Sequence, residues 1–402
     1  MIHFLKLSKS IFFVLIIGIF CNAYAQKNNS KLYIIDFDEL NKEKNSITNS
    51  RDKQAFKEFR DLTKKANKLL DRAVFSVVHK TGSPLSKDKH DYMSIGPYWW
   101  SNPITNDGLP YIRRDGEINP ESRNNFTDYV EKNDFISAVK ILTKAYFFTD
   151  DVKYANKNIE FINAWFLNPI TKMNPNLNYG QYVPGRSYGR CFGIIEVHRF
   201  VEVLKFLELA KERNILDKNI EEGMVNWFTE YVYWLQNSTL GKEGATRKNN
   251  HGTYYDIQLL NILLYLNKIN MVKKHLATTT KRRIFSQIEP DGRQPLELAR
   301  TKSFSYSVMN LHGFLELASI GKKVGIDLWN VSSKDGRSLK AGFKYIIPYI
   351  TNKKHWKYQQ IKSTEHSEET LISDLKYIQK HFGDTTFDAV LHELHQKNND
   401  KD

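Results

Sequence analysis

Apolar residues recur at helical spacing along most of the chain. This spacing predicts helices over residues 52–77, 126–148, 152–166, 194–213, 221–236, 254–267, 271–287, 304–320, 339–350, 367–382 and 387–396. One short patch, residues 32–37, has a strand-like pattern instead. The chain is therefore predicted to be all-α.

Helices that are apolar almost all round alternate with amphipathic ones, and an all-round apolar helix needs to be buried on every side. Antiparallel helix pairs wound into an incomplete (α/α) toroid satisfy this pattern, because the apolar set then lines the inside. Two long stretches, residues 81–125 and 171–190, are rich in Gly, Pro and aromatic residues. Long irregular loops in a compact domain usually carry function. We expect them at one rim of the toroid, around a cleft.

The first 25 residues have the pattern of a secretory signal rather than of a folded element. Lys6 and Lys9 precede the apolar run 11–20, and Ala23-Tyr24-Ala25 fits the small-x-small cleavage rule. We expect cleavage after Ala25 and a periplasmic or secreted protein with no stable membrane insertion, since the run is short for a membrane span.

Residues 26–50 form a polar leader, and residues 51–402 are predicted to be one catalytic domain that ends in a charged helical segment, 355–402. Cleavage would leave Cys191 alone, so no intrachain disulfide is expected. The net charge of +14 becomes +12 without the two signal lysines. Much of this excess lies on the Lys-rich stretches 53–68 and 273–283, which fit solvated surfaces. Outside the cytoplasm the remaining excess favours an acidic polysaccharide over nucleic acid as partner.

A compact polar cluster, Asn249 to Asp256, stands at the head of a very apolar helix. Asn249 or Asn250 is a natural N-cap, which puts His251 in the first turn beside free backbone N–H groups that suit an anion. Tyr254 follows His251 on the same helical stripe. The alternative is that the Asn residues only cap the helix and His251 is a core histidine.

The loop 81–125 places the aromatic rings of Trp99 and Trp100 near the guanidinium groups of Arg113 and Arg114. Aromatic rings stack on sugars, and Arg binds a carboxylate through two parallel hydrogen bonds. We interpret these four residues as a subsite for an acidic sugar, although at least one Trp is expected to be buried as a loop anchor.

Two further stretches also place a tyrosine near an arginine. Tyr188 and Arg190 lie in the second loop, and Arg300 and Tyr306 flank the opening of another apolar helix. Taken alone, Arg300 could be a structural partner of Glu297, and Tyr306 a core tyrosine.

Three motifs together resemble the alginate lyase superfamily of α/α-toroid polysaccharide lyases. They are Pro97-Tyr98-Trp99-Trp100-Ser101-Asn102-Pro103, Asn249-Asn250-His251, and Leu296-Glu297-Leu298-Ala299-Arg300 followed by a helix with Tyr306. The likeness spans about residues 92–310. Gly252-Thr253 and the spacing of Tyr306 from Arg300 depart from the best-known members, which indicates a divergent branch. The resemblance implies β-elimination at a uronic acid, with Asn250, His251, Arg300 and Tyr306 as the catalytic residues.

The chemistry can also be reasoned from the residues. Removal of the C5 proton of a uronate requires neutralisation of the adjacent carboxylate, which Asn250, His251 and Arg300 could supply. Tyr306 is the expected acid, and either Tyr306 or neutral His251 is the base. The expected substrate is a 4-O-linked uronic-acid polysaccharide, alginate (polymannuronate) or glucuronan, which differ only at C2. Trp99, Trp100, Arg113, Arg114, Tyr188, Arg190 and Tyr254 are the expected substrate-binding residues.

Two other functions are compatible with the same cleft. A toroidal glycoside hydrolase would need two facing carboxylic acids, and Asp91, Asp107, Asp115, Glu117 and Asp256 form no such arrangement in the sequence. The other alternative is a non-catalytic protein that binds acidic glycans. No metal motif such as H-E-x-x-H is present, and neither a metal nor another cofactor is expected.

Overall fold

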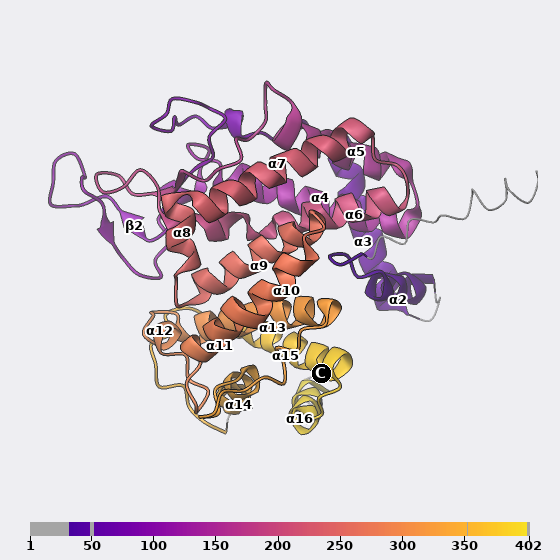
Figure 1. Ribbon diagram of the computed structural model, residues 1–402, viewed down its shortest axis with the longest axis vertical. Coiled ribbons are helices and arrows are strands. Elements are labelled where there is room, and N and C mark those ends of the chain that lie inside the picture. Colours follow the sequence, from indigo (N-terminus) through magenta and orange to yellow (C-terminus); the bar gives the residue numbers. More distant parts are fainter. Residues whose placement is uncertain (1–31, 49–51, 352, 400–402) are drawn as a thin grey trace, which may run out of the picture. The chain divides into compact units, whose positions relative to one another are not determined.

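The computed structural model describes residues 32–48, 52–351 and 353–399 (Figure 1). The predicted signal, residues 1–25, lies outside these ranges. The helices are α2 (Phe37–Thr48), α3 (Lys53–Leu70), α4 (Tyr129–Thr149), α5 (Val152–Ile162), α6 (Val201–Glu212), α7 (Lys218–Asn237), α8 (Thr239–Ala245), α9 (Asn250–Tyr265), α10 (Ile269–His275), α11 (Lys281–Gln287), α12 (Pro295–Leu298), α13 (Ser303–Val324), α14 (Leu339–Ile350), α15 (Glu365–Phe382) and α16 (Asp388–Asn399). Short 3-10 helices are η1 (Val77–His79), η2 (Pro120–Arg123) and η4 (Cys191–Phe200), and π-helical turns are η3 (Asn163–Leu167) and η5 (Leu276–Thr280).

Five helices pack in succession, each against the next: α4 on α6, α6 on α9, α9 on α13 and α13 on α15. Of these, α4, α9 and α13 carry buried residues around most of their circumference, as an inner wall requires. Between them along the chain come α5, α7, α10 and α14, which each bury one face. The all-α expectation and the incomplete (α/α) toroid are therefore confirmed.

Four very short strands fasten the two long loops at one end of the helices. Strand β1 (Met93–Ile95) pairs in parallel with β4 (Tyr179–Tyr182), and β2 (Trp99–Trp100) pairs antiparallel with β3 (Ile112–Arg113). In the second pair Trp99 lies opposite Arg113. The first pair joins two loops that are far apart in the sequence, so together the loops form one rim, as the sequence predicts.

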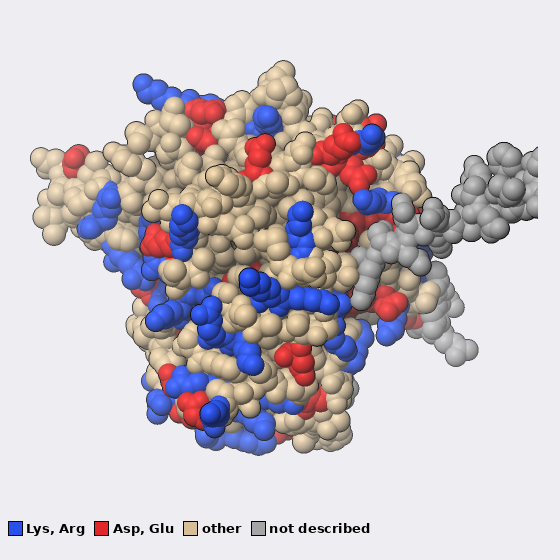
Figure 2. Space-filling view, viewed as in Figure 1, with Lys and Arg blue, Asp and Glu red and all other residues tan. Residues whose placement is uncertain are grey.

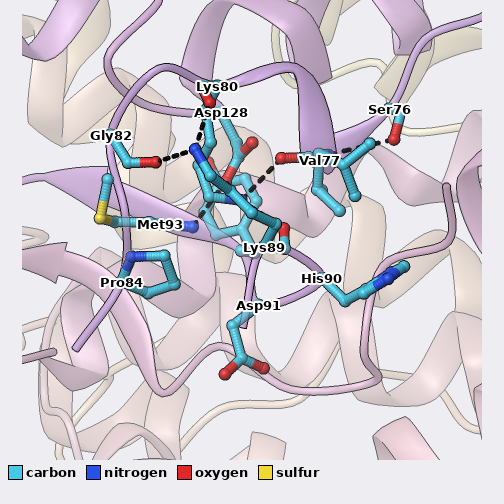
Figure 3. Close-up of polar contacts among 12 residues, drawn as sticks. Ser76, Val77, Lys80, Gly82, Pro84, Lys89, His90, Asp91, Met93 and Asp128 are labelled. Carbon is cyan, nitrogen blue, oxygen red and sulfur yellow. Dashed lines mark hydrogen bonds and ion pairs between the residues drawn. The ribbon is translucent and has the colours of Figure 1, made fainter. Parts of the chain in front are cut away.

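A buried ion pair anchors the first loop to the start of α4 (Figure 3). The Nζ of Lys80 lies 3.0 Å from Asp128 Oδ2, and both side chains are fully buried. The Asp128 carboxylate also accepts the backbone N–H of Met93, while Lys80 donates to the carbonyl oxygens of Val77 and Lys89. Burial lowers the pKa of Lys80 and raises the pKa of Asp128, so each charge depends on its partner.

The amino-terminal part of the described chain differs from the prediction. The strand-like patch at 32–37 does not pair as a strand. The backbone N–H groups of Ile34 and Ile35 both donate to Glu208 Oε2 instead. Helix α2 then begins at Phe37, whose ring contacts Phe147 at the end of α4. The compact unit that contains these helices starts at Ile34.

Two predicted helices are less regular than their apolar pattern indicates. The first third of the predicted helix 194–213 belongs to the 3-10 helix η4, in which Gly193 packs directly on the backbone of Gly180 in β4. A side-chain carbon on Gly193 would come within 2.6 Å of that backbone. The predicted helix 271–287 is divided by η5. Apolar spacing alone does not distinguish these turns from α-helix.

The carboxyl-terminal segment completes the helical wall and holds the start of α13. Helix α15 packs along α13. Before it, Trp356 Nε1 donates to Ser303 Oγ, and Gln360 Oε1 accepts the backbone N–H of Phe304. This segment therefore fixes the helix opening that carries Tyr306.

Lysine and arginine side chains gather on the outer face over α10 and α11 (Figure 2). Lys273, Lys274 and Arg282 are exposed there, which agrees with a solvated surface. Arg283 is the exception in this stretch, because it is buried and pairs with Asp256. Within the described ranges, no helix combines the length and apolar character that a membrane crossing needs.

The Lys80–Asp128 pair provides a test of how the first loop is held. Lys80→Met should lower the free energy of unfolding by ~3–5 kcal/mol, because it leaves a buried carboxylate without its cation. Urea denaturation of the variant and of Lys80→Met/Asp128→Leu measures this loss. The double variant should recover part of the stability, and a loss in the single variant that stays below about 1 kcal/mol would show that the pair does not anchor the loop.

Candidate active site

A cavity of about 580 Å³ opens at the rim where the two long loops meet the first turns of α9 and α13. It is lined by Pro97, Tyr98, Trp99, Arg113, Arg123, Tyr129, Lys132, Asn133, Gln181, Arg190, Phe192, Ile195, Glu196, His198, Arg199, Asn250, His251, Arg300, Tyr306 and Met309. The four residues predicted to be catalytic, Asn250, His251, Arg300 and Tyr306, are all among them. Helices far apart in the sequence therefore bring these side chains to one cavity.

The carboxylate of Glu297 fixes the start of α9. Asn249 is the N-cap residue, and the backbone N–H and the side-chain amide of Asn250 donate to the two oxygens of Glu297, each at 2.7 Å. Burial raises the pKa of Glu297 to about 7, and the bonds from Asn250 oppose this rise. The Asn250 amide keeps one hydrogen that Glu297 does not take, so it can still donate into the cavity.

Gly252 and Thr253 have structural roles in this first turn. A side-chain carbon at Gly252 would lie 2.1 Å from Arg283 Nη1 and 2.1 Å from the Arg247 carbonyl oxygen. Thr253 Oγ1 donates to Asn310 Oδ1 of α13 at 2.7 Å. Their poor helix preference is therefore explained by close packing between helices.

His251 is held as a neutral imidazole. Its ring meets the Phe192 ring edge to face with centroids 4.7 Å apart, and its Nδ1 is buried without a hydrogen-bond partner in the described chain. Burial lowers the pKa of His251 to about 3, and the positive charges of Arg300, Arg190 and Arg247 act in the same direction. The side chain therefore presents an unprotonated nitrogen at neutral pH.

Arg300 is oriented by Asp115, and not by Glu297 as the structural alternative expected. Its Nε and Nη2 donate to the two Asp115 oxygens at 3.1 and 2.9 Å. Asp115 also accepts from the backbone N–H and the hydroxyl of Thr301. Burial works against the Asp115 charge, but the hydrogen bond and charge of Arg300 hold its pKa well below the ordinary value.

Tyr306 shares a short hydrogen bond with Tyr98. Their hydroxyl oxygens are 2.5 Å apart, and the Arg300 guanidinium lies 4.2 Å from the centre of the Tyr306 ring. Burial, followed by the effect of Tyr98, raises the pKa of Tyr306 well above the ordinary value, although Arg300 opposes the rise. The phenol is therefore protonated at neutral pH, and it can donate a proton.

Three of the predicted substrate-binding residues line the cavity. The Arg190 guanidinium lies 5.4 Å from the Trp99 ring centre and 4.3 Å from the Phe192 ring centre. Arg113 lies opposite Trp99 in the strand pair and donates to Asp115. Trp99, Arg113 and Arg190 therefore combine an aromatic face with positive charge, as the sequence predicts.

The structure does not bring the other four to the cavity. Trp100 donates through Nε1 to the Glu117 carbonyl, and Arg114 stacks on its outer side, so this pair anchors the loop. Tyr188 is 69% exposed outside the cavity. Tyr254 is buried deeper in α9, where its hydroxyl bonds to the Met309 carbonyl. These four residues lie outside the lining of the cavity, and their part in substrate binding stays a prediction.

Asp256 lies in α9 five residues after His251, but its side chain bonds to other residues. Its carboxylate accepts from His275, Thr280 and Arg283, and burial is offset by these partners so that its pKa is lowered. Arg283 in turn donates to the carbonyl oxygen of Arg247 just before α9. Asp256 therefore stabilises the entry to α9 and does not touch the imidazole.

Sequence reasoning missed several residues of the site. Tyr98 stands next to Trp99 in the same motif and could have been included on that ground. Asp115 carried no signal that links it to Arg300, 185 residues later. The far end of the cavity, with Arg123, Lys132 and Arg199, was also missed, because these residues lie in segments that look like ordinary helices or loop.

The arrangement combines a neutral imidazole, a protonated phenol and cations that have few carboxylate partners. Such a set can bind an anion and exchange protons with it. In the part of the chain that the structure describes, no three His, Cys, Asp or Glu side chains are grouped closely enough to hold a metal ion.

Comparisons with known proteins show the family and the fold of the chain. The sequence pattern of the alginate lyase family matches residues 76–356. The chain is similar to the crystal structure of an alginate lyase from Bacteroides ovatus, with 38% identity over 90% of this chain and 95% of that one and a TM-score of 0.85. Alginate lyase A1-III from Sphingomonas species A1 shares the fold, with 16% identity over 81% and 88% of the two chains and a TM-score of 0.52. A complex of an A1-III variant with a tetrasaccharide is similar at 17% identity over 81% and 87%, with a TM-score of 0.51. Among curated proteins, none matches the chain.

The state of His251 can be measured directly. Because its pKa lies near 3, its ring signals in nuclear magnetic resonance should not shift between pH 5 and pH 8 in the free protein. Loss of one set of signals in His251→Gln assigns them. A midpoint inside that pH range would mean that burial and the three arginines do not keep this imidazole neutral.

Proposed function

This chain belongs to the alginate lyase family and is a polysaccharide lyase, and we propose that it cleaves 4-O-linked β-uronate chains by β-elimination at the cavity around His251 and Tyr306. The observation that carries the proposal is that Asn250, His251, Arg300 and Tyr306 line one cavity. Mannuronate blocks of alginate are the first substrate, in keeping with the Bacteroides ovatus relative described as an alginate lyase. Glucuronan is the second, because its uronate differs only at C2, away from the bonds that break.

The first step in the proposed reaction is neutralisation of the substrate carboxylate. Asn250 has one free amide hydrogen, and Arg300 keeps Nη1 free after Asp115 has bound its Nε and Nη2. Both groups are rigidly held, so they need little reorganisation as negative charge moves from C5 into the carboxyl group. One donor of this kind is typically worth ~10²- to 10³-fold in rate.

The second step is proton transfer on one face of the sugar. In β-linked mannuronate and glucuronate the C5 hydrogen and the C4 oxygen leave from the same side. We assign the base to His251, which is neutral and has a free nitrogen, and the acid to Tyr306, which is protonated. His251 takes the C5 proton, the electron pair forms the C4=C5 bond, and Tyr306 protonates the leaving oxygen. The positive charge of Arg300, 4.2 Å from the centre of the Tyr306 ring, lowers the pKa of Tyr306 and so stabilises the phenolate that forms.

Substrate binding increases the basicity of His251 in this scheme. In the free protein burial lowers its pKa, and the surrounding arginines lower it further. A uronate carboxylate adds a negative charge beside them, and a nearby opposite charge favours the protonated imidazole. The base therefore becomes stronger when the substrate is in place.

We also propose that the protein is exported, on the basis of the signal-like residues 1–25. An exported lyase would meet a polysaccharide that is too large to enter the cell. The mature chain would then begin at Gln26.

Incubation with polymannuronate, glucuronan and glycosaminoglycans tests the reaction and its substrate. Polymannuronate, glucuronan or both should give rising ultraviolet absorbance from the new C4=C5 double bond. Tyr306→Phe should lower kcat by about 10²- to 10⁴-fold, since it removes the general acid. Tyr233→Phe, which changes an exposed tyrosine of α7 outside the cavity, is the matched control and should keep full activity.

A folded protein that produces no unsaturated ends from any polymer would overturn the proposed substrate class. Reducing ends without that absorbance would point to hydrolysis instead.

The base assignment has its own test, because a small base can enter the space left by a truncated side chain. His251→Ala should lose most of its activity and regain part of it when imidazole is added, while Tyr306→Phe should not respond. Equal responses of the two variants, or none in His251→Ala, would assign the base to Tyr306 rather than to His251.

A further inference from the structure

The cavity has a second positively charged end, which the proposed reaction does not use. Arg123, Lys132 and Arg199 line it, together with Tyr129 and Asn133. Lys132 lies in α4, Arg123 in η2, which precedes α4 in the chain, and Arg199 in η4. The scaffold therefore builds this end from segments that are different from those that carry His251 and Tyr306.

The two charged ends are electrostatically distinct. The charges that act most strongly on Lys132 are those of Glu196, Arg123 and Arg199, whereas His251 is affected by Arg300, Arg190 and Arg247. None of these groups appears in both sets. One cavity thus contains two separate concentrations of positive charge.

Arg199 is the best placed of the three to bind a ligand. It is half-buried against the cavity, and its guanidinium forms no ion pair or hydrogen bond with any residue that the structure describes. Burial of a guanidinium without a partner is costly. Its position is explained if an anion from the substrate supplies the missing bonds.

Its two neighbours are fixed in place around an aromatic ring. The Arg123 guanidinium lies 3.6 Å from the Tyr129 ring centre, and Lys132 Nζ lies 4.6 Å from the same centre. Lys132 is 2% exposed and donates to the Glu196 carbonyl oxygen at 2.5 Å. Neither cation lies within ion-pair distance of a carboxylate in the described chain.

Glu196 supplies a complementary acceptor for a sugar hydroxyl. Its Oε2 accepts from Tyr92 and Ser94, whereas its Oε1 is buried and has no partner in the described chain. The side chain is 7% exposed and lines the cavity. A hydroxyl donor and a carboxylate on one ligand would satisfy Glu196 Oε1 and Arg199 together, and a uronate residue carries both groups.

We propose that Arg199, supported by Arg123 and Lys132, forms a second carboxylate subsite that binds a neighbouring uronate of the chain being cleaved. This inference rests on the proposed function and narrows it. Sites of ~300–1,000 Å³ enclose ligands larger than one sugar ring, and this cavity of about 580 Å³ falls within that range. The preferred substrate is therefore a polymer of consecutive uronates, in which an acidic residue always stands beside the one that reacts.

The test combines a variant of the enzyme with a variant of the substrate. Arg199→Gln should raise KM on polymannuronate or glucuronan by about tenfold or more, the effect of one lost charge-assisted hydrogen bond, while kcat stays within about threefold. On the same polymer with a large fraction of its carboxyl groups reduced to alcohols, the variant and the wild type should have nearly equal KM values. Arg123→Gln should behave in the same way, with a smaller effect.

Arg282→Gln is the matched control, since it removes one positive charge from an exposed site on α11. Equal KM values for Arg199→Gln and Arg282→Gln would overturn the second subsite. A rise in KM for Arg199→Gln that is equal on the native polymer and on the polymer with reduced carboxyl groups would also overturn the second subsite. If the wild type released no unsaturated product, the proposed function would fail, and calorimetric binding of polymannuronate to the wild type and Arg199→Gln would still decide whether Arg199 binds a carboxylate.

Discussion

The Asp115 carboxylate is the contact on which the candidate site depends. It binds Arg300 through two hydrogen bonds and also accepts the backbone N–H and the hydroxyl of Thr301. In this way a residue of the first long loop holds the turn that precedes α13. The same loop carries Tyr98, and α13 carries Tyr306, so the bond between these two phenols requires the loop and the helix to stay together. Without Asp115, the Arg300 guanidinium would have no carboxylate partner in the described chain, and the loop would lose its strongest attachment to the helix.

The cavity holds more positive charge than its own carboxylates neutralise. Burial lowers the pKa of His251 and this excess acts in the same direction, so the free protein keeps a neutral imidazole beside three arginines. Burial keeps the Tyr306 phenol protonated in the same space. An anionic substrate relieves the excess, which links binding to the basicity of His251. An anionic substrate also stabilises Arg199 in the second charged end of the cavity, because this half-buried guanidinium has no partner in the described chain.

The sequence predicted the helices well where their apolar pattern is long, and its motifs named four residues that line one cavity. It could not predict which side chains meet across long separations. The structural alternative paired Arg300 with Glu297, three residues away, but Arg300 pairs with Asp115, and Glu297 holds Asn250 instead. Tyr254 shares a helical stripe with His251 but lies one turn deeper, where the cavity has ended. The spacing of residues predicts which face of a helix a side chain occupies. Whether that part of the helix reaches the cavity depends on how the helices pack. Arg199 was missed for a related reason, because its segment has the apolar pattern of an ordinary helix, and the cavity that it lines is visible only in the packed structure.

The central claim is that Asp115 and Arg300 act as one unit in the reaction. A double-mutant cycle on kcat/KM, with Asp115→Asn, Arg300→Gln and the double variant, measures this most directly. If Asp115 works by positioning Arg300, the double variant should be no worse than the worse single variant, with all three proteins folded. Losses that simply add in free energy would contradict the account, because the two residues would then contribute independently.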